Sequence, residues 1–344
     1  MIAPPPRPPA STTHVAIVGA GIAGLALAWR LVERGAQVTL LDGGHGGASR
    51  VPVALINPFR GRSGRPGRFD VAGAREFWRL AAQLGEQGID PGAERSGVLR
   101  VASNESQVRS WRSHEGLEEM AEVPPGLAGA AGVFLAPLGG YVVPGRMLAG
   151  LRELLTDRGV DLLDDTPVTR VSRSGSGWQL WTARGSLQAT RVVLATGASP
   201  LPEIEGVPGG LGGDFEVNLG EVVELRGPDA PRVDLPRPVA GPVYLAKVGY
   251  SVYVGGNRRG PDREDTKVAQ LLRESAVRMV PALAGWQVAS VWSGRRLRHL
   301  GNEPQCLQLA PGLWFLGAFG GRGFLTAALF ARLLARRLMA LRDD

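Results

Sequence analysis

Short runs of apolar residues alternate along this chain with stretches in which apolar residues recur every three or four positions. Residues 15–18 and 38–41 are apolar runs, the second broken only by Thr39, which is typical of parallel strands buried on both faces. The stretch between them has a helical pattern, so residues 14–42 predict a strand–helix–strand unit. Similar apolar runs predict buried strands at 160–163, 192–195 and 313–316.

The rest of the chain mixes helical and alternating patterns. Helical periodicity predicts further helices at 71–84, 106–120, 145–158, 265–279 and 324–342. Alternation of apolar and polar residues predicts strands at 96–103, 168–172, 178–183, 187–190, 216–225, 243–248, 251–255 and 288–297. The Gly-rich residues 43–50 predict a flexible turn that could wrap a ligand. Together these patterns predict an α/β fold with α+β elements.

The bulk composition is that of an ordinary globular chain. With 344 residues, of which 44% are hydrophobic, it is long enough for one large domain or two interlocked domains. No apolar run approaches the roughly 20 residues of a membrane span. The Pro-rich residues 1–13 resemble neither a signal peptide nor an anchor, so we expect a disordered tail and a cytoplasmic protein.

The counts of cysteine and histidine exclude two kinds of site. The single cysteine, Cys306, excludes an internal disulfide and a Cys-x-x-Cys redox pair. The four histidines lack the spacing of metal ligands, so we expect no metal site.

The excess of basic residues leaves two interpretations open. The chain has 39 Lys and Arg against 32 Asp and Glu, and Lys247 and Lys267 are its only lysines. A GC-rich genome would produce such an Arg-rich composition, and attraction to an acidic partner would also explain it. The segment 60–68, in which arginines are interspersed with glycines, would then contact the phosphates of such a partner.

Three glycines follow the first predicted strand in the spacing Gly-x-Gly-x-x-Gly: Gly19, Gly21 and Gly24. The first would allow a tight turn, the second would let a pyrophosphate approach the backbone, and the third would let the helix pack closely on the sheet. The helix that begins with Ile22 and Ala23 would offer N–H groups and the positive end of its dipole to the phosphates.

An acidic residue, Asp42, closes the second strand, 18 residues after Gly24. Its carboxylate would accept hydrogen bonds from ribose hydroxyls and would repel a 2′-phosphate, which disfavours NADP. Because strands flank the glycines on both sides, the pattern predicts a dinucleotide site rather than a turn without a ligand.

The order of these elements resembles that of the flavin-dependent amine oxidases related to D-amino-acid oxidase and glycine oxidase. Beyond the N-terminal motif, the resemblance rests on residues 47–49, 192–197, 220–225, 254–256 and 315–324. It implies a Rossmann-like FAD-binding domain interlocked with a mixed-sheet substrate domain. The FAD-binding domain would comprise residues 14–85, 141–215 and 300–344, and the substrate domain residues 86–140 and 216–299.

The resemblance also implies further contacts to FAD. Residues of the loop after the acid would contact the flavin, namely Ala48, Ser49 and Arg50. A second segment would contribute Val168, through its backbone to adenine, together with Thr196 and Gly197. The last segment would be Gly320, Gly321, Arg322, Gly323 and Phe324. Its N–H groups and helix dipole would face the N1–C2=O edge of the flavin, where charge accumulates on reduction; the alternative is an ordinary strand–helix turn.

The implied reaction oxidises the C–N bond of an amino acid or secondary amine by hydride transfer to flavin N5, with oxygen as reoxidant. The other Gly-rich segment, 206–213, leads into a strand and predicts a loop, so only one dinucleotide site is recognisable. The substrate itself would therefore reduce the flavin. A disguised second site, with reduction by NADH, is the alternative.

Arg296 matches the arginine that holds the substrate carboxylate in this family. A guanidinium makes two parallel hydrogen bonds to a carboxylate and so would fix the α-carbon for catalysis. The alternative is a surface arginine among its neighbours. Tyr244, Tyr250 and Tyr253 would line the pocket or else pack within the strands. Cys306 does not match the position of a covalent flavin link, so we expect a core thiol and non-covalent FAD.

Within this family, residues 47–58 and 321–329 resemble the oxidase half of bifunctional enzymes that modify 5-aminomethyl groups on wobble uridine of tRNA. The length of the chain leaves room only for that half. Residues 298–304 lack the Asp expected after the Arg-rich strand. A free small-molecule amine and a tRNA-borne substrate therefore stay open, as does a degenerate FAD-binding protein or a subunit of a dehydrogenase complex. The sequence does not predict the oligomeric state.

Overall fold

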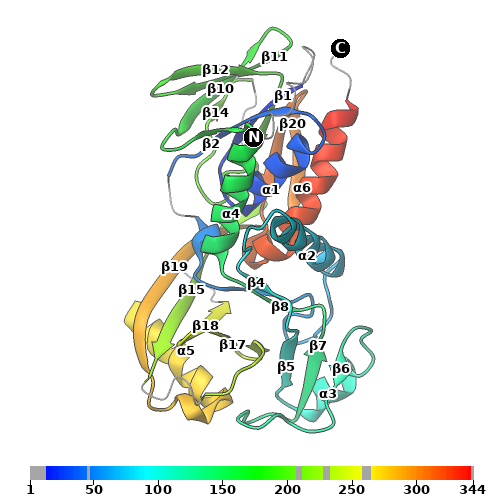
Figure 1. Cartoon of the computed structure of the whole chain (residues 1–344), viewed down its shortest axis with the longest axis vertical. Coiled ribbons are helices and arrows are strands. Elements are labelled where there is room, and N and C mark those ends of the chain that lie inside the picture. The colour runs from blue at the N-terminus through cyan, green and yellow to red at the C-terminus, as the bar shows by residue number, and fades with distance from the viewer. Residues whose placement is uncertain (1–12, 45–46, 207–210, 228–232, 258–264, 342–344) are drawn as a thin grey trace.

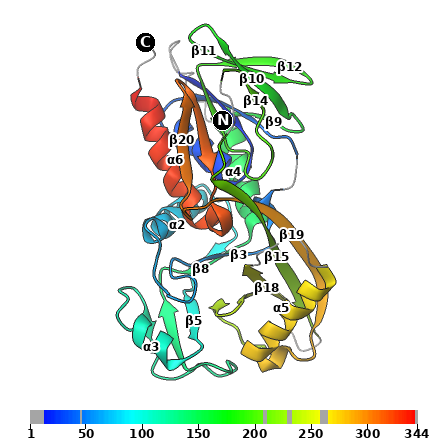
Figure 2. The same cartoon turned by 180° about the vertical axis from the view of Figure 1, so that it is seen from behind.

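The computed structural model describes residues 13–44, 47–206, 211–227, 233–257 and 265–341. Figure 1 shows an elongated molecule with an upper lobe that contains α1 and α6 and a lower lobe that contains α3 and α5; Figure 2 shows the same two lobes from behind. The predicted tail at 1–13 lies almost entirely outside the described residues, as does much of the predicted loop at 206–213.

The upper lobe is built on a six-stranded sheet with the order β20-β21-β13-β1-β2-β9. At its centre, β1 (His14–Val18) pairs in parallel with both β2 (Gln37–Leu41) and β13 (Arg191–Leu194). Next to β13, also in parallel, lies β21 (Leu313–Gly317). These strands confirm the prediction from the apolar runs, since nearly all their residues are buried.

Helices cover one face of this sheet. The helix α1 (Ile22–Val32) is buried along almost its whole length and packs against α6 (Gly323–Ala340). The helices α2 (Asp70–Glu86) and α4 (Pro144–Asp157) complete this layer by packing on α6 and α1. The helices predicted at these positions are confirmed.

The two edges of the sheet differ from expectation. The prediction of a buried strand at 160–163 was wrong about burial, because β9 (Asp161–Leu163) pairs only with β2 and leaves Asp161 and Leu163 exposed. At the other edge, β20 (Gln305–Ala310) runs antiparallel to β21. It was not predicted, since its residues are only partly buried and carry a weak apolar signal.

A four-stranded sheet caps the upper lobe and confirms the strands predicted at 168–172, 178–183 and 187–190. It consists of β10 (Val168–Ser174), β11 (Gly177–Thr182), β12 (Gly185–Ala189) and the short β14 (Glu203–Ile204). Its buried Trp178 donates a hydrogen bond to Pro311 O at 3.1 Å and so attaches this sheet to the larger one.

The lower lobe is built on an eight-stranded sheet whose core packs against α5 (Asp265–Met279). In order, its strands are β19 (Gln287–His299), β15 (Phe215–Arg226), β18 (Ser251–Asn257), β17 (Tyr244–Val248), β16 (Val239–Ala240), β5 (Val98–Ala102), β7 (Gly132–Ala136) and β6 (Glu118–Glu119). The long antiparallel pair of β15 and β19 runs from this lobe up to the upper lobe (Figure 1).

The helix predicted at 106–120 was wrong in its C-terminal half. The observed helix is α3 (Glu105–Trp111), capped by Asn104 Oδ1, which accepts a hydrogen bond from Gln107 N at 3.0 Å. Gly116 has a φ of +88°, a conformation incompatible with a continuing helix, and the chain then enters β6. Strand pairing with β7 therefore overrides the local helical pattern.

A three-stranded sheet lies where the lobes meet. It contains β3 (Ala54–Ile56), β8 (Gly140–Val142) and β4 (Ala93–Glu94), and so joins strands from both predicted domains. The flexible turn predicted at 43–50 includes a short 3-10 helix, Ala48–Arg50, while residues 45–46 lie outside the described chain. None of the described helices combines the length and apolar character needed to cross a bilayer.

Candidate functional site

A cavity of about 2330 Å³ runs from the start of α1 to the lower lobe. This volume exceeds that of a typical single-ligand pocket, roughly 300–1,000 Å³. Most of the residues predicted to form the site line this cavity: Gly19, Gly21, Ile22, Ala23, Asp42, Ala48, Ser49, Arg50, Val168, Thr196, Gly197, Tyr244, Arg296, Gly320, Gly321, Gly323 and Phe324. The side chains or backbone of Gly24, Arg322 and Tyr253 are not part of the lining.

The turn between β1 and α1 depends on glycines at positions that leave no room for a side chain. Gly19 has a φ of +110°, and a Cβ there would lie 2.5 Å from Ala195 O. A Cβ on Gly24 would lie 1.9 Å from Gly19 O, so this glycine allows the helix to pack against the turn rather than contacting a ligand itself. The start of α1 therefore faces the cavity with its backbone exposed to a ligand.

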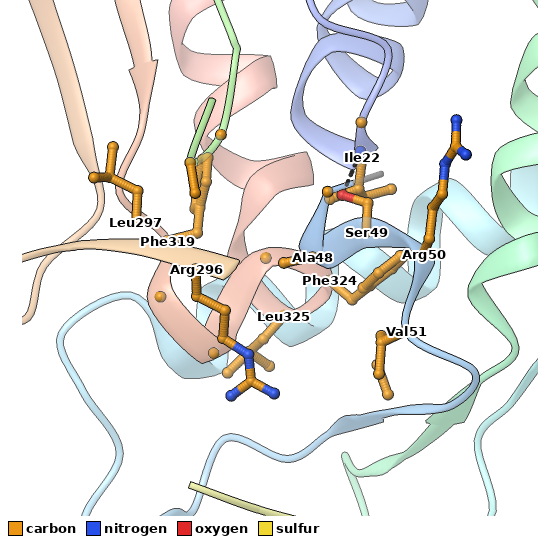
Figure 3. A pocket seen from close by; sticks show the side chains of 18 of the residues that line it. Ile22, Ala48, Ser49, Arg50, Val51, Arg296, Leu297, Phe319, Phe324 and Leu325 are labelled. Carbon is orange, nitrogen blue, oxygen red and sulfur yellow. Dashed lines mark hydrogen bonds between the residues drawn. The ribbon is translucent and has the colours of Figure 1, made fainter. Parts of the chain in front are cut away.

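Two side chains organise this helix start. Ser49 Oγ accepts a hydrogen bond from Ile22 N at 3.2 Å, which holds the 3-10 helix over the beginning of α1 (Figure 3). Asp42 Oδ1 accepts a hydrogen bond from Ala20 N at 3.3 Å. The Asp42 carboxylate thus lies at the end of β2 and on the cavity wall, beside the glycine turn.

The end of β13 presents an unsatisfied donor to the same region. The hydroxyl of Thr196 is buried and has no hydrogen-bond partner among the described residues. Gly197, which follows, has a φ of +62°. Because a buried hydroxyl without a partner costs free energy, this position fits a ligand that completes its hydrogen bonding.

Two residues of the turn before α6 have a left-handed backbone conformation, and the residue between them pairs with β19. Ala318 has a φ of +57° and Gly320 a φ of +54°, and Phe319 forms a β-bridge with Arg298 of β19. Arg322 was expected to contact the cofactor, but its side chain turns away from the cavity and reaches Asp70 Oδ1 at 3.5 Å. Burial lowers the pKa of Arg322.

Arg296 extends from β19 into the cavity, near the start of α6 that carries Phe324 and Leu325, and the Arg50 side chain points away from Arg296 (Figure 3). Its guanidinium lies over Gly220 of the paired strand, where a Cβ would be 2.0 Å from Arg296 Cζ. Burial lowers the pKa of Arg296. The strand glycine therefore opens the hollow that this arginine needs.

A second strand glycine makes room for Tyr244. A Cβ on Gly255, which pairs with Tyr244 across β17 and β18, would lie 2.2 Å from its ring. The hydroxyl of Tyr244 donates a hydrogen bond to Val53 O at 3.1 Å, and burial raises the pKa of Tyr244 to about 12. The phenol therefore stays neutral at physiological pH.

Three other predicted candidates lie elsewhere. Tyr253 was wrongly expected in the pocket; it lies on β18 beside Glu224, and burial raises its pKa. Tyr250 is 75% exposed on a turn. Cys306 is partly buried on β20, does not line the cavity, and has a pKa raised to about 11 by burial, so its thiol is protonated and poorly placed for a covalent link.

The basic segment at 60–68 contributes arginines to the cavity wall, a placement that the sequence did not predict. Arg60, Arg62 and Arg65 line the cavity, and Arg60 pairs with the buried Asp70 at 3.1 Å. Sequence reasoning also missed Arg100 and Trp111, which line the same wall. The only signal was a charged residue inside the apolar run at 98–102.

Acidic residues occur only at the other end of the described lining, namely Asp42, Asp164 and Asp165. Asp165 lies beside Gly44, and Asp164 pairs with Arg152. The cavity thus has one end of glycine backbone and carboxylates, suited to a dinucleotide, and one end of arginines, suited to an anionic reactant.

Curated proteins that resemble this chain carry a common name. The tRNA 5-methylaminomethyl-2-thiouridine biosynthesis bifunctional protein MnmC of Azoarcus sp. (strain BH72) is 28% identical over 392 residues, which cover 97% of this chain and 58% of that protein. The protein of the same name from Thiobacillus denitrificans is 28% identical over 95% of this chain and 56% of its own length. The chain therefore spans just over half the length of these relatives.

Solved structures of similar fold include glycine oxidase from Geobacillus kaustophilus, with a TM-score of 0.81, 24% identity and 96% of both chains covered. Iminodiacetate oxidase from Chelativorans sp. BNC1 has a TM-score of 0.78 and 21% identity over 95% of this chain and 96% of that chain. At this level of identity the comparison shows a shared fold.

The model of one protein family, described as FAD dependent oxidoreductase, matches residues 14–337. The match includes both large sheets and the cavity, and it confirms the family and the cofactor that the motifs implied. This chain belongs to the DAO family of FAD-dependent oxidoreductases.

Proposed function

We propose that this protein oxidises the C–N bond of an amine that carries a carboxylate, as an amino acid or an N-carboxymethyl secondary amine does, and that oxygen is the electron acceptor. The observation that carries the proposal is the position of Arg296 on the cavity wall, in the hollow opened by Gly220. A guanidinium held there offers two parallel donors to a carboxylate.

The residues at the glycine-rich end fit FAD. The turn at Gly19 leaves no room for a side chain, and Thr196 has a buried hydroxyl without a protein partner. We infer that the start of α1 holds the pyrophosphate, that Asp42 accepts hydrogen bonds from ribose, and that the turn before α6 contacts the isoalloxazine edge. When bound, FAD supplies the hydride acceptor for the carbon next to the substrate nitrogen.

The protein's part in the reaction is positioning. Arg296 would fix the carboxylate and thereby the adjacent carbon, while Phe324 and Leu325 line the cavity close to it and would exclude water (Figure 3). No histidine or glutamate occurs in the described lining, and its aspartates lie at the nucleotide end. The amine would therefore release its proton to solvent before it binds, so kcat/KM should rise with pH up to the pKa of the substrate amine.

Anaerobic mixing of the FAD-loaded protein with a panel of amines tests this function. We expect carboxylated amines to bleach the flavin absorbance, and the matching amines without a carboxylate to react far more slowly. Equal rates for both sets, or fast bleaching by NADH alone, would contradict the proposal; the second outcome would indicate a disguised dinucleotide site.

A tRNA-borne amine is the second candidate substrate. It is supported by the name that the curated relatives share and by Arg60, Arg62 and Arg65 of segment 60–68 on the cavity wall. In the same anaerobic experiment, tRNA whose uridine carries an aminomethyl group with a carboxylate on its nitrogen substituent should reduce the flavin, with a rate that falls steeply as salt is added. A rate with free amino acids that exceeds the rate with tRNA would favour the free substrate.

A further inference from the structure

One arginine of the cavity wall is buried without a counter-charge. Arg100 is 4% exposed within β5, a strand whose other residues are all buried and apolar. Its guanidinium lies 4.6 Å from the centre of the Trp111 ring, and its Nη2 donates a hydrogen bond to Gly61 O at 2.7 Å. Its Nε is buried with no hydrogen-bond partner, and no carboxylate pairs with Arg100 in the described part of the chain.

Such an arrangement is costly for the isolated protein. Burying a charge without a paired anion is strongly unfavourable, because the bond to Gly61 O and the Trp111 ring replace only part of the lost hydration. Burial, together with the nearby Arg60, lowers the pKa of Arg100 to about 10, so the guanidinium is still charged at neutral pH. An anion that enters the cavity would supply the missing partner.

The neighbouring loop presents two more arginines to the same space. Its backbone carbonyls are held by the lower lobe: Arg100 binds Gly61 O, and Trp111 Nε1 donates to Arg62 O at 3.1 Å. With the carbonyls turned toward β5 and α3, Arg62 and Arg65 line the cavity as exposed side chains. Neither has an ion-pair partner among the described residues.

This cluster is separate from Arg296. In the eight-stranded sheet, β5 and β19 are separated by the four strands β15, β18, β17 and β16. With strands about 4.8 Å apart, this corresponds to roughly 24 Å measured along the sheet. Both arginines nevertheless line one cavity, so a single elongated substrate could contact both.

We propose that Arg100, Arg62 and Arg65 form a second oxyanion subsite, which holds a phosphate or carboxylate of the substrate remote from the group that Arg296 binds. The inference rests on the proposed function only in placing the substrate in this cavity. The chemistry required is an oxyanion with several acceptor atoms, which the planar guanidinium of Arg100, stacked on Trp111, is suited to bind.

The test measures binding of inorganic phosphate to the FAD-loaded protein by calorimetry at constant ionic strength. Arg100→Gln, and separately the double variant Arg62→Gln/Arg65→Gln, should weaken phosphate binding by about tenfold or more. The matched control is Arg112→Gln, which removes a charge at the end of α3 that pairs with Glu119 outside the cavity.

Arg100→Gln could loosen the loop that carries Arg62 and Arg65. The double variant keeps the test valid in that case, because the Arg62 and Arg65 side chains are exposed. Two ligand pairs then identify the source of the oxyanion: uridine 5′-monophosphate against uridine, and hexanoate against hexan-1-ol. In each pair the members differ by one anionic group. If the anionic member of the first pair binds more tightly than the neutral one, and Arg100→Gln abolishes this difference, the oxyanion is a nucleotide phosphate. The same result for the second pair indicates a carboxylate.

Two results would overturn the subsite: phosphate binding that is equal in wild type, Arg100→Gln and the double variant, or weakening to the same degree in Arg112→Gln. If the role of Arg100 were merely structural, Arg100→Gln would weaken the binding of uridine and of its monophosphate to the same degree. Failure of the proposed function has a different signature, because an Arg296 variant with unaltered amine oxidation would refute that assignment and leave the phosphate measurements untouched.

Discussion

The end of the cavity near α1 is made mostly of backbone, whereas the part lined by Arg296 and, farther along the sheet, by Arg100 is made of long side chains. At the first end, glycines at the start of α1 and before α6 leave peptide groups facing the ligand, and the charged residues include three aspartates. At the second, arginines from β5, β19 and segment 60–65 reach into the space. The backbone-lined end therefore suits a dinucleotide, and the arginine-lined part suits an anionic reactant.

The two ends also differ in how the chain assembles them. Gly19, Gly24 and Asp42 come from one strand–helix–strand unit, so short-range contacts place them together. Arg296 and Tyr244 come from β19 and β17, which become neighbours of one site only when the eight-stranded sheet has formed. Substitutions at the first end should therefore affect folding and FAD binding together, while substitution of Arg296 at the second should affect the reaction alone.

The largest effect is expected for Gly24→Ala. A Cβ at this position would lie 1.9 Å from Gly19 O, a backbone atom that cannot move without distorting the turn. Overpacking of this kind costs about 3 kcal/mol or more, so we expect loss of bound FAD and a much lower Tm. Flavin content and thermal unfolding measure both.

Gly85→Ala is the matched control, because Gly85 lies in α2 with nothing within 4 Å of an added Cβ. Alanine in a helix is more favourable than glycine by about 0.5–1 kcal/mol, so this variant should be as stable as wild type or more so. Normal FAD content in Gly24→Ala would show that the turn tolerates a side chain and would remove the contrast between the two ends.

Arg296→Lys should lower kcat/KM on the order of a hundredfold while FAD binding and stability stay normal. Lysine keeps the charge but not the planar pair of donors, and a misplacement of about 1 Å can cost this much in rate. Steady-state kinetics with a carboxylated amine provides the measurement. Unchanged kinetics would defeat the site assignment.

The control for Arg296→Lys is Arg298→Lys on the same strand. Arg298 pairs with Glu216 and donates to Asn302 Oδ1 at 2.7 Å, outside the cavity. Arg295 is less suitable, because it also lines the cavity. We expect the Arg298 variant to retain wild-type kinetics with the same substrate.

The contrast between the two ends explains what the sequence could predict. The glycine motif and Asp42 were identified because their spacing is local and each residue has one physical role. Arg296 came from a family resemblance, since nothing in the strand itself distinguishes it from Arg295. Arg100 was missed because its position depends on Trp111 and on the carbonyl of Gly61, which are brought to it by tertiary contacts.

Secondary structure shows the same limit. The strands of the upper sheet were predicted from apolar runs, because both of their faces are covered. The helix predicted at 106–120 was wrong where β6 pairs with β7, since a two-residue strand carries no periodicity of its own. Gly220 and Gly255 lie in predicted strands, yet only the structure shows which side chains fill the space that they leave.

Asp42→Ala should weaken FAD binding by about tenfold to a hundredfold, since a hydrogen bond to a charged group contributes about 1.5–3 kcal/mol. The carboxylate also accepts from Ala20 N, so part of the loss would come from the turn. Titration of the apoprotein with FAD measures the effect. Asp161→Ala, on the exposed edge strand, is the control, and equal affinity in all three proteins would contradict the ribose assignment.

The smallest effect is expected for Tyr244→Phe, and it should depend on pH. Burial raises the pKa of Tyr244 to about 12 from the ordinary 10.0, so the unfolded chain loses this proton before the folded protein does. The stabilisation is therefore fully present below pH 10 and is lost as pH rises from 10 toward 12. Tyr244→Phe removes one hydrogen bond, to Val53 O, worth about 1 kcal/mol, and should flatten this alkaline loss of stability. Urea unfolding between pH 8 and 11.5 measures it, with Tyr250→Phe at an exposed position as control.

Because Tyr244 does not ionise below pH 10, the rise of kcat/KM with pH should follow the substrate amine and be the same in wild type and Tyr244→Phe. A pH profile that shifts in the variant would mean that the phenol takes part in proton transfer, and the arginine end of the cavity would then do more than position its substrate.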